Sequence, residues 1–100
     1  MRTFEYLVVI QPRKSGEYRA WLPAWPSVFF SGRTVRNVVR YLRDELRERL
    51  MLKKTNGVEP PRDVKRPPKH IRDLVARQDI RAQRSPLRRR VCVTRIRVSV

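Results

Sequence analysis

The chain has 100 residues, 40% of them hydrophobic, and its 25 Lys and Arg against 9 Asp and Glu give a formal net charge of +16 at pH 7. This length allows one domain with a modest core. The excess of positive charge disfavours an ordinary surface on which both signs of charge are mixed, and it predicts a polyanionic partner. Nucleic acid is favoured over a membrane surface, because no segment pairs a basic face with a wide apolar one.

The single cysteine and the short apolar runs limit the class of protein further. Cys92 has no partner for an intrachain disulfide and no companions for a cysteine-based zinc site, and its apolar neighbours predict a small core residue. No run is long enough for a signal peptide or a membrane-spanning helix, so we expect a cytoplasmic protein.

Three short strands are predicted in the first thirty residues. Phe4–Ile10 and Tyr18–Leu22 are rich in aromatic and β-branched residues, and the turn chemistry of residues 11–17 makes them a hairpin. Ser27–Phe30 is a short third strand that ends at Ser31 and Gly32.

Two prolines, Pro23 and Pro26, separate the second and third predicted strands. They suit either a proline-rich ligand for a peptide-binding domain or a hairpin corner. The flanking aromatic residues and the helical pattern that follows favour the corner, where we expect Trp21 and Trp25 to pack rather than to stack on bases.

The strongest helical pattern follows, over residues 35–54. Thr34 is a good N-cap, and Gly57 with the prolines after it ends the pattern. One stripe at helical spacing is apolar and predicts the core face: Val35, Val38, Val39, Leu42, Leu46 and Leu50.

Four arginines fall in a narrow band beside that stripe at 100° per residue: Arg36, Arg40, Arg43 and Arg47. Two interpretations remain open, an ordinary solvated helix face and a ridge that follows phosphates.

The last forty residues are basic and proline-punctuated. Residues 60–69 are predicted to be a linker, and His70–Arg84 a short helix with a narrow apolar side. That side comprises Ile71, Leu74, Val75 and Ala82.

Val91–Val100 alternates as a strand should. Arg95 and Arg97 point to one face, and the other face carries Cys92, Thr94, Ile96, Val98 and Val100.

Charge increases along the chain. Residues 1–30 hold four cations and two acids, a net charge of +2. Residues 31–60 hold eight cations and four acids, a net charge of +4, and residues 61–100 hold thirteen cations and three acids, a net charge of +10. We therefore expect most nucleic-acid contacts in the basic extension and a second set from the helix arginines. The extension residues are Arg62, Lys65, Arg66, Lys69, Arg72, Arg77, Arg81, Arg84, Arg88, Arg89 and Arg90.

The stretch Y-x-A-W-L-P-A-W-P-S-V-F-F-S-G-R-T, from Tyr18 to Thr34, resembles the N-terminal domain of the HicB antitoxin family, a partial RNase-H-like fold. The resemblance lies in an aromatic strand, a proline-x-x-proline corner, a short strand and a glycine-x-threonine entry to a helix. It implies an α+β fold in β-β-β-α-β order, with one long amphipathic helix packed on the sheet. Residues 1–58 and 91–100 would form this domain, and residues 59–90 a basic, extended or partly helical insertion before the last strand.

No catalytic constellation is apparent, so we predict no enzyme, no metal site and no cofactor. The acidic residues fall mostly in turns or on helix surfaces, whereas metal-assisted hydrolysis needs clustered carboxylates. His70 is the only histidine and has no companion base or nucleophile. The glycines are isolated and form no phosphate-binding loop.

Three interpretations of the function remain. The first is a structural rRNA-binding protein, ribosomal or ribosome-associated, with rRNA and neighbouring ribosomal proteins as partners. The alternative is a HicB-like antitoxin or transcriptional regulator that binds DNA and a small toxin as a dimer, and a third is a DNA-coating protein of chromatin type. An extended segment 60–90 favours the ribosome; a folded DNA-reading unit there favours regulation.

Overall fold

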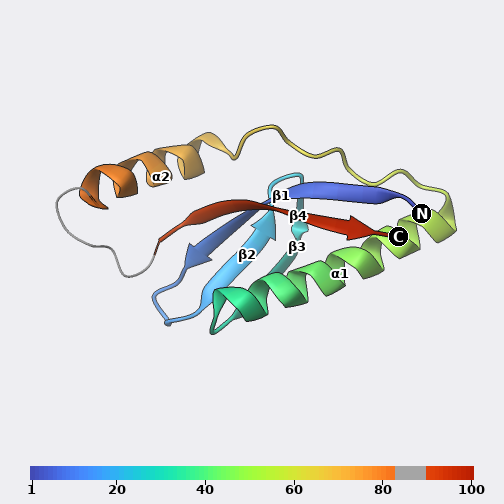
Figure 1. Ribbon diagram of the computed structural model, residues 1–100, viewed down its shortest axis with the longest axis horizontal. Coiled ribbons are helices and arrows are strands. Elements are labelled where there is room, and N and C mark those ends of the chain that lie inside the picture. Colours follow the sequence, from blue (N-terminus) through green and yellow to red (C-terminus); the bar gives the residue numbers. More distant parts are fainter. Residues whose placement is uncertain (83–89) are drawn as a thin grey trace.

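The computed structural model describes residues 1–82 and 90–100, with side chains up to Gln78 and from Arg90 onward. It is an α+β fold, as predicted, in which a four-stranded antiparallel sheet has the order β3-β2-β1-β4 (Figure 1). The elements in chain order are β1 (Thr3–Pro12), β2 (Tyr18–Leu22), β3 (Trp25–Gly32), α1 (Val35–Asn56), α2 (Lys69–Ala82) and β4 (Cys92–Ser99).

The first three strands form a meander whose corner is where the prolines predict it. Pro23 and Ala24 lie between β2 and β3, and Pro26 lies in β3, an edge strand where a missing N–H costs no ladder hydrogen bond. β3 is longer than predicted: it continues to Gly32, which pairs with Tyr18. β1 is also longer and includes Pro12, which the sequence assigns to the turn.

Helix α1 begins and ends as predicted. The hydroxyl of Thr34 accepts a hydrogen bond from the N–H of Asn37 at 3.1 Å, and Gly57 caps the other end in the left-handed conformation, with φ 68°. Gly32 allows close approach, because a Cβ there would lie 2.9 Å from a methyl group of Val38.

The main core lies between α1 and one face of the sheet. Aliphatic side chains of the α1 stripe meet inward residues of all four strands, and Tyr6 lies among them. The fully buried members from α1 are Val38, Leu42, Leu46 and Leu50.

A smaller core covers the opposite face of the sheet. Leu7 and Val9 of β1 are buried there beneath Ile71 of α2, which is fully buried. Figure 1 shows α2 and the chain that leads to it on the side of the sheet away from α1. Leu74 and Val75 pack beside Ile71, as predicted, whereas the side chain of Ala82 and the helix predicted at residues 83–84 lie outside the described residues.

The prediction of a buried Cys92 is wrong. Ile96 and Val98 of β4 are buried under α1, but Cys92 and Thr94 are exposed although they share the same face. The C-terminal half of α1 reaches only the far end of β4, so the alternation continues where α1 does not cover it.

Within the described part of the chain, neither helix has the length and apolarity needed to cross a membrane.

Candidate functional site

One line of arginines runs along the outside of α1, and we call it the arginine ridge: Arg36, Arg40, Arg43 and Arg47. All four side chains are exposed, and none forms an ion pair with another described residue. Successive members are three or four residues apart, which separates them by about 4.5 to 6 Å along the axis. The structure therefore brings the predicted helix arginines together on one rigid element.

Among the described residues, no acidic side chain of α1 forms an ion pair with the ridge arginines. Glu45 pairs with Arg49 at 2.9 Å, and Arg49 also donates a hydrogen bond to the hydroxyl of Ser27. Lys54 extends the ridge, since it follows Arg36 by 18 residues, or five helical turns. The sequence analysis missed Lys54, although that spacing predicts it.

The predicted extension residues are not gathered in the same way. The described ones are exposed and distributed over the chain after α1, over α2 and at the start of β4: Arg62, Lys65, Arg66, Lys69, Arg72, Arg77 and Arg90. The side chain of Arg81 is outside the described residues, as are Arg84, Arg88 and Arg89 entirely. The described members form no single line along one element.

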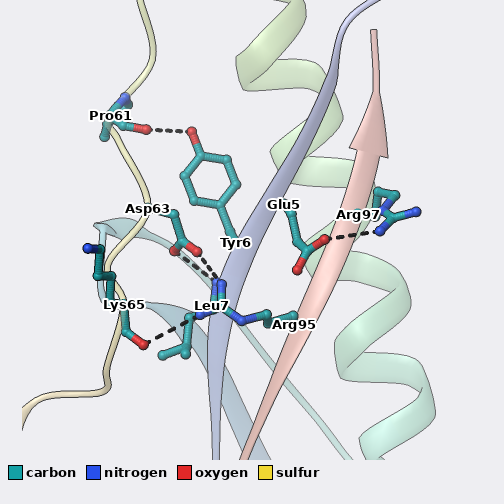
Figure 2. A network of polar contacts seen from close by, with 8 residues as sticks. All are labelled: Glu5, Tyr6, Leu7, Pro61, Asp63, Lys65, Arg95 and Arg97. Carbon is teal, nitrogen blue, oxygen red and sulfur yellow. Dashed lines mark hydrogen bonds and ion pairs between the residues drawn. The ribbon is translucent and has the colours of Figure 1, made fainter.

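Residues 59–68, which we call the strap, connect α1 to α2 and lie beside β1 (Figure 2). The hydroxyl of Tyr6 donates a hydrogen bond to the carbonyl of Pro61 at 2.6 Å. The N–H of Leu7 donates to one carboxylate oxygen of Asp63 at 3.0 Å, and the other oxygen pairs with Arg95. The segment expected to be a free linker is thus tied to two strands.

Arg95 and Arg97 point away from α1, as the alternation predicts, and both meet carboxylates. Arg97 pairs with Glu5 at 3.2 Å across the strands, and Arg95 also reaches the carbonyl of Lys65 (Figure 2). The sequence analysis did not find these partners, because they are far apart in the chain.

The pKa values of three side chains near the strap differ from their ordinary values. Burial first, and the negative charge of Asp63 second, raise the pKa of the Tyr6 phenol. The hydrogen bond from the Arg2 guanidinium lowers the pKa of the Glu59 carboxyl, and the same contact raises the pKa of Arg2. The two shifts at Arg2 and Glu59 both favour the charged forms that make up this ion pair.

Among the described residues, no three His, Cys, Asp or Glu side chains lie close enough together to bind a metal ion. His70 is exposed in the first turn of α2.

Comparisons with known proteins identify the class of fold. No family model matches the sequence, and no curated protein matches it either. The fold is that of a HicB antitoxin N-terminal domain, as the motif from Tyr18 to Thr34 implies. The matching structure is the crystal structure of the N-terminal domain of Burkholderia pseudomallei antitoxin HicB, with a TM-score of 0.54 and 18% identity over 97% of this chain and 98% of that one.

This match corrects the leading functional interpretation. The interpretation as an rRNA-binding ribosomal or ribosome-associated protein is wrong, because the matching fold is an antitoxin domain. The match also spans 97% of the chain and leaves almost nothing for a separate ribosomal-type extension.

Proposed function

We propose that this chain is a non-catalytic regulator of the HicB antitoxin type, which acts in the cytoplasm and binds DNA and a toxin partner. The observation that carries the proposal is the uncompensated arginine ridge on α1, in a fold matched over nearly its whole length by an antitoxin domain. The acids support a non-catalytic role, because Glu5, Asp63 and Glu59 are each engaged by an arginine.

The ridge binds DNA through its phosphates. Guanidinium groups spaced by about 4.5 to 6 Å on one helix follow the backbone of a strand and form paired hydrogen bonds to phosphate. Binding releases condensed counterions, so affinity falls steeply with salt. Sequence preference then depends on contacts beyond the ridge.

The toxin partner binds on the other side of α1. A groove of about 570 Å³ there is lined by Trp25 and Leu52, with two acids and two bases around them: Glu45, Glu48, Arg49 and Lys53. Leu52 is 57% exposed, and balanced charge beside apolar side chains suits a protein better than a polyanion. At 100° per residue, Leu52 lies nearly opposite the ridge, so both partners fit at once.

The test compares two variants that lose the same charge. One replaces Arg36, Arg40, Arg43 and Arg47 by Gln, and the other replaces Arg62, Arg66, Arg72 and Arg77 by Gln. Fluorescence anisotropy measures their binding to duplex DNA from the gene's own upstream region between 50 and 300 mM salt. We expect the ridge variant to lose on the order of 100-fold in affinity and about 3 to 4 units of salt slope. Equal losses in both variants contradict the ridge as the DNA site.

The partner is tested by co-expression with the small protein encoded beside this gene. A complex should elute as one species in size-exclusion chromatography and should be lost in Leu52→Glu but retained in Met51→Glu, which changes another exposed apolar residue of α1. Failure of the neighbouring protein to bind wild-type protein contradicts the antitoxin role.

A further inference from the structure

The first half of β1 has a neighbouring strand on only one side. β4 pairs with β1 from Thr3 to Ile10, whereas β2 pairs with it only from Val9 to Pro12. Residues 3–7 therefore have a second edge that no strand covers. This is the edge along which the strap lies in Figure 2.

The direction of each backbone group along this edge follows from the β1–β4 register. Arg2 and Val100 exchange both backbone hydrogen bonds, at 2.8 and 2.9 Å, so alternate residues of β1 after Arg2 bond to β4. The N–H and C=O groups of Thr3, Glu5 and Leu7 consequently point to the open edge. The bond from the Leu7 N–H to Asp63 confirms this direction.

The strap satisfies only part of this edge. Asp63 takes the N–H of Leu7 with a side chain rather than with its backbone, and no described residue accepts from the N–H of Glu5. Between the two segments lies a groove of about 290 Å³. Its walls are β1, from Arg2 to Tyr6, and the strap, from Glu59 to Asp63.

A second cavity, of about 240 Å³, adjoins the groove at the end of α1. Its apolar lining includes Leu50, Val58 and Val100, and it shares Arg2, Phe4, Glu59 and Pro60 with the groove. The Arg2–Glu59 ion pair belongs to both linings, and its side chains are 61% and 77% exposed. The pair is bidentate, with hydrogen bonds of 2.9 and 3.1 Å, but water reaches both side chains, so a bound peptide can compete for them.

Cations dominate the charge that remains free around these two spaces. The carboxylates of Glu5, Glu59 and Asp63 are each paired with an arginine. Lys53 and Lys54 line the cavity and Arg62 lines the groove, and none of the three forms an ion pair with a described residue. In a chain of net charge +16, this arrangement favours an acidic occupant.

We propose that the groove binds an acidic, extended peptide segment of a partner protein as an added strand along residues 3–5 of β1, next to the Leu7 N–H that Asp63 occupies. The peptide backbone bonds to the N–H and C=O of Glu5, one apolar side chain enters the cavity at Leu50 and Val58, and acidic side chains meet Lys54 and Arg62. Main-chain bonds then supply affinity and the cavity supplies selectivity. This site contains none of the four ridge arginines, although Lys54 borders both, and it does not depend on the proposed DNA binding.

The test uses a capped peptide, acetyl-Glu-Leu-Glu-Val-Glu-amide, added to the ¹⁵N-labelled full chain. We expect saturable shifts in the amide signals of residues 3–7 and at least tenfold slower hydrogen exchange of the Glu5 N–H. The control peptide has the same side chains, but alternate amides are N-methylated and cannot pair with a strand. It should bind at least tenfold more weakly.

Two pairs of variants locate the site. Glu5→Pro removes the outward N–H, whereas Glu5→Ala keeps it, so only the proline variant should lose binding. If the proline variant does not fold, Val58→Glu becomes the test and Met51→Glu its control. Both residues are exposed, but only Val58 lines the cavity. Val58→Glu should weaken binding at least fivefold.

Three results overturn the proposal. They are equal binding of the N-methylated peptide, shifts confined to the free edges of β3 or β4, and no binding at millimolar peptide. The DNA affinity of the same variants is measured alongside and should be unchanged, so a failure of this site is distinguishable from a failure of the ridge.

Discussion

The two faces of the sheet are covered in different ways. On one face, α1 seals an apolar core in which Leu42 and Leu46 are fully buried. On the other face, three side chains of the described residues form the buried cluster, and at the sheet edge the strap is fixed by polar contacts from Tyr6 and Leu7 to residues 55 or 56 positions away.

This difference separates global from local stability. Complete burial of a leucine stabilises by about 1.5 to 3 kcal/mol, whereas a hydrogen bond contributes about 0.5 to 1.5 kcal/mol net. The α1 face should therefore set the free energy of unfolding of the whole domain. The strap and α2 should open in a local step that leaves the α1 core intact.

The largest effect is expected at the centre of the α1 core. Leu46→Ala should lower the free energy of unfolding by about 3 to 4 kcal/mol, through lost burial and the cavity left behind. Urea denaturation followed by circular dichroism measures it. The control is Leu52→Ala on the same helix, where the side chain is 57% exposed and the change should stay within about 0.5 kcal/mol.

The second prediction concerns the opposite face. Ile71→Ala should cost about 2 kcal/mol, at the low end for such a truncation, because the small cluster can collapse around the site. Amide hydrogen exchange should show lost protection in α2 with protection in α1 retained. Equal loss in both helices contradicts the separation of the two faces.

A smaller effect is expected at the strap anchor. Asp63→Ala leaves the Leu7 N–H without its acceptor and Arg95 with only the carbonyl of Lys65, and should cost about 1 to 2 kcal/mol. Limited proteolysis within residues 59–68 should become faster. Asp63→Asn keeps one acceptor oxygen, so it should lower the free energy of unfolding less than half as much. The control is Asp73→Ala, at an exposed position of α2, which should behave as wild type.

The smallest effect is at Tyr6, and it depends on pH. Tyr6→Phe removes the hydrogen bond to Pro61 and should cost about 1 kcal/mol at pH 7. The pKa of Tyr6 is raised in the folded state, so its contribution to the free energy of unfolding depends on pH. This contribution is complete below the ordinary tyrosine pKa of about 10 and is lost as pH rises through the raised pKa of the folded protein.

Urea denaturation between pH 8 and 11 measures this decline. The wild-type free energy of unfolding should fall above about pH 10, and Tyr6→Phe should remove part of that fall. Tyr41→Phe, which changes an exposed tyrosine on α1, is the matched control and should keep it. The same slope in all three proteins contradicts the role given to Tyr6.

Local patterns predicted the elements that depend on local physics. The period of Val38, Leu42 and Leu46 predicted α1 and its buried face, and Thr34 and Gly57 predicted its ends. The motif from Tyr18 to Thr34 predicted the hairpin corner and the class of fold. The four ridge arginines were found in the same way, because helical spacing alone places them together.

The sequence did not predict the contacts that depend on distant partners. Asp63 stands among prolines and cations, and its local pattern gave no sign that it accepts from Leu7 and pairs with Arg95. The apolar neighbours of Cys92 predicted a core residue, but they do not record how far α1 covers that face of the strand, and Cys92 is exposed.

By itself, then, the sequence determined the α+β class, the amphipathic helix, its caps and its exposed arginines, since these follow from the spacing of neighbouring residues. Only the tertiary structure decided that the strap closes on β1, that half of the β1 edge stays open, and that this edge adjoins an apolar cavity. Those features arise where segments more than fifty residues apart meet, and no local pattern records which backbone groups are left without a partner.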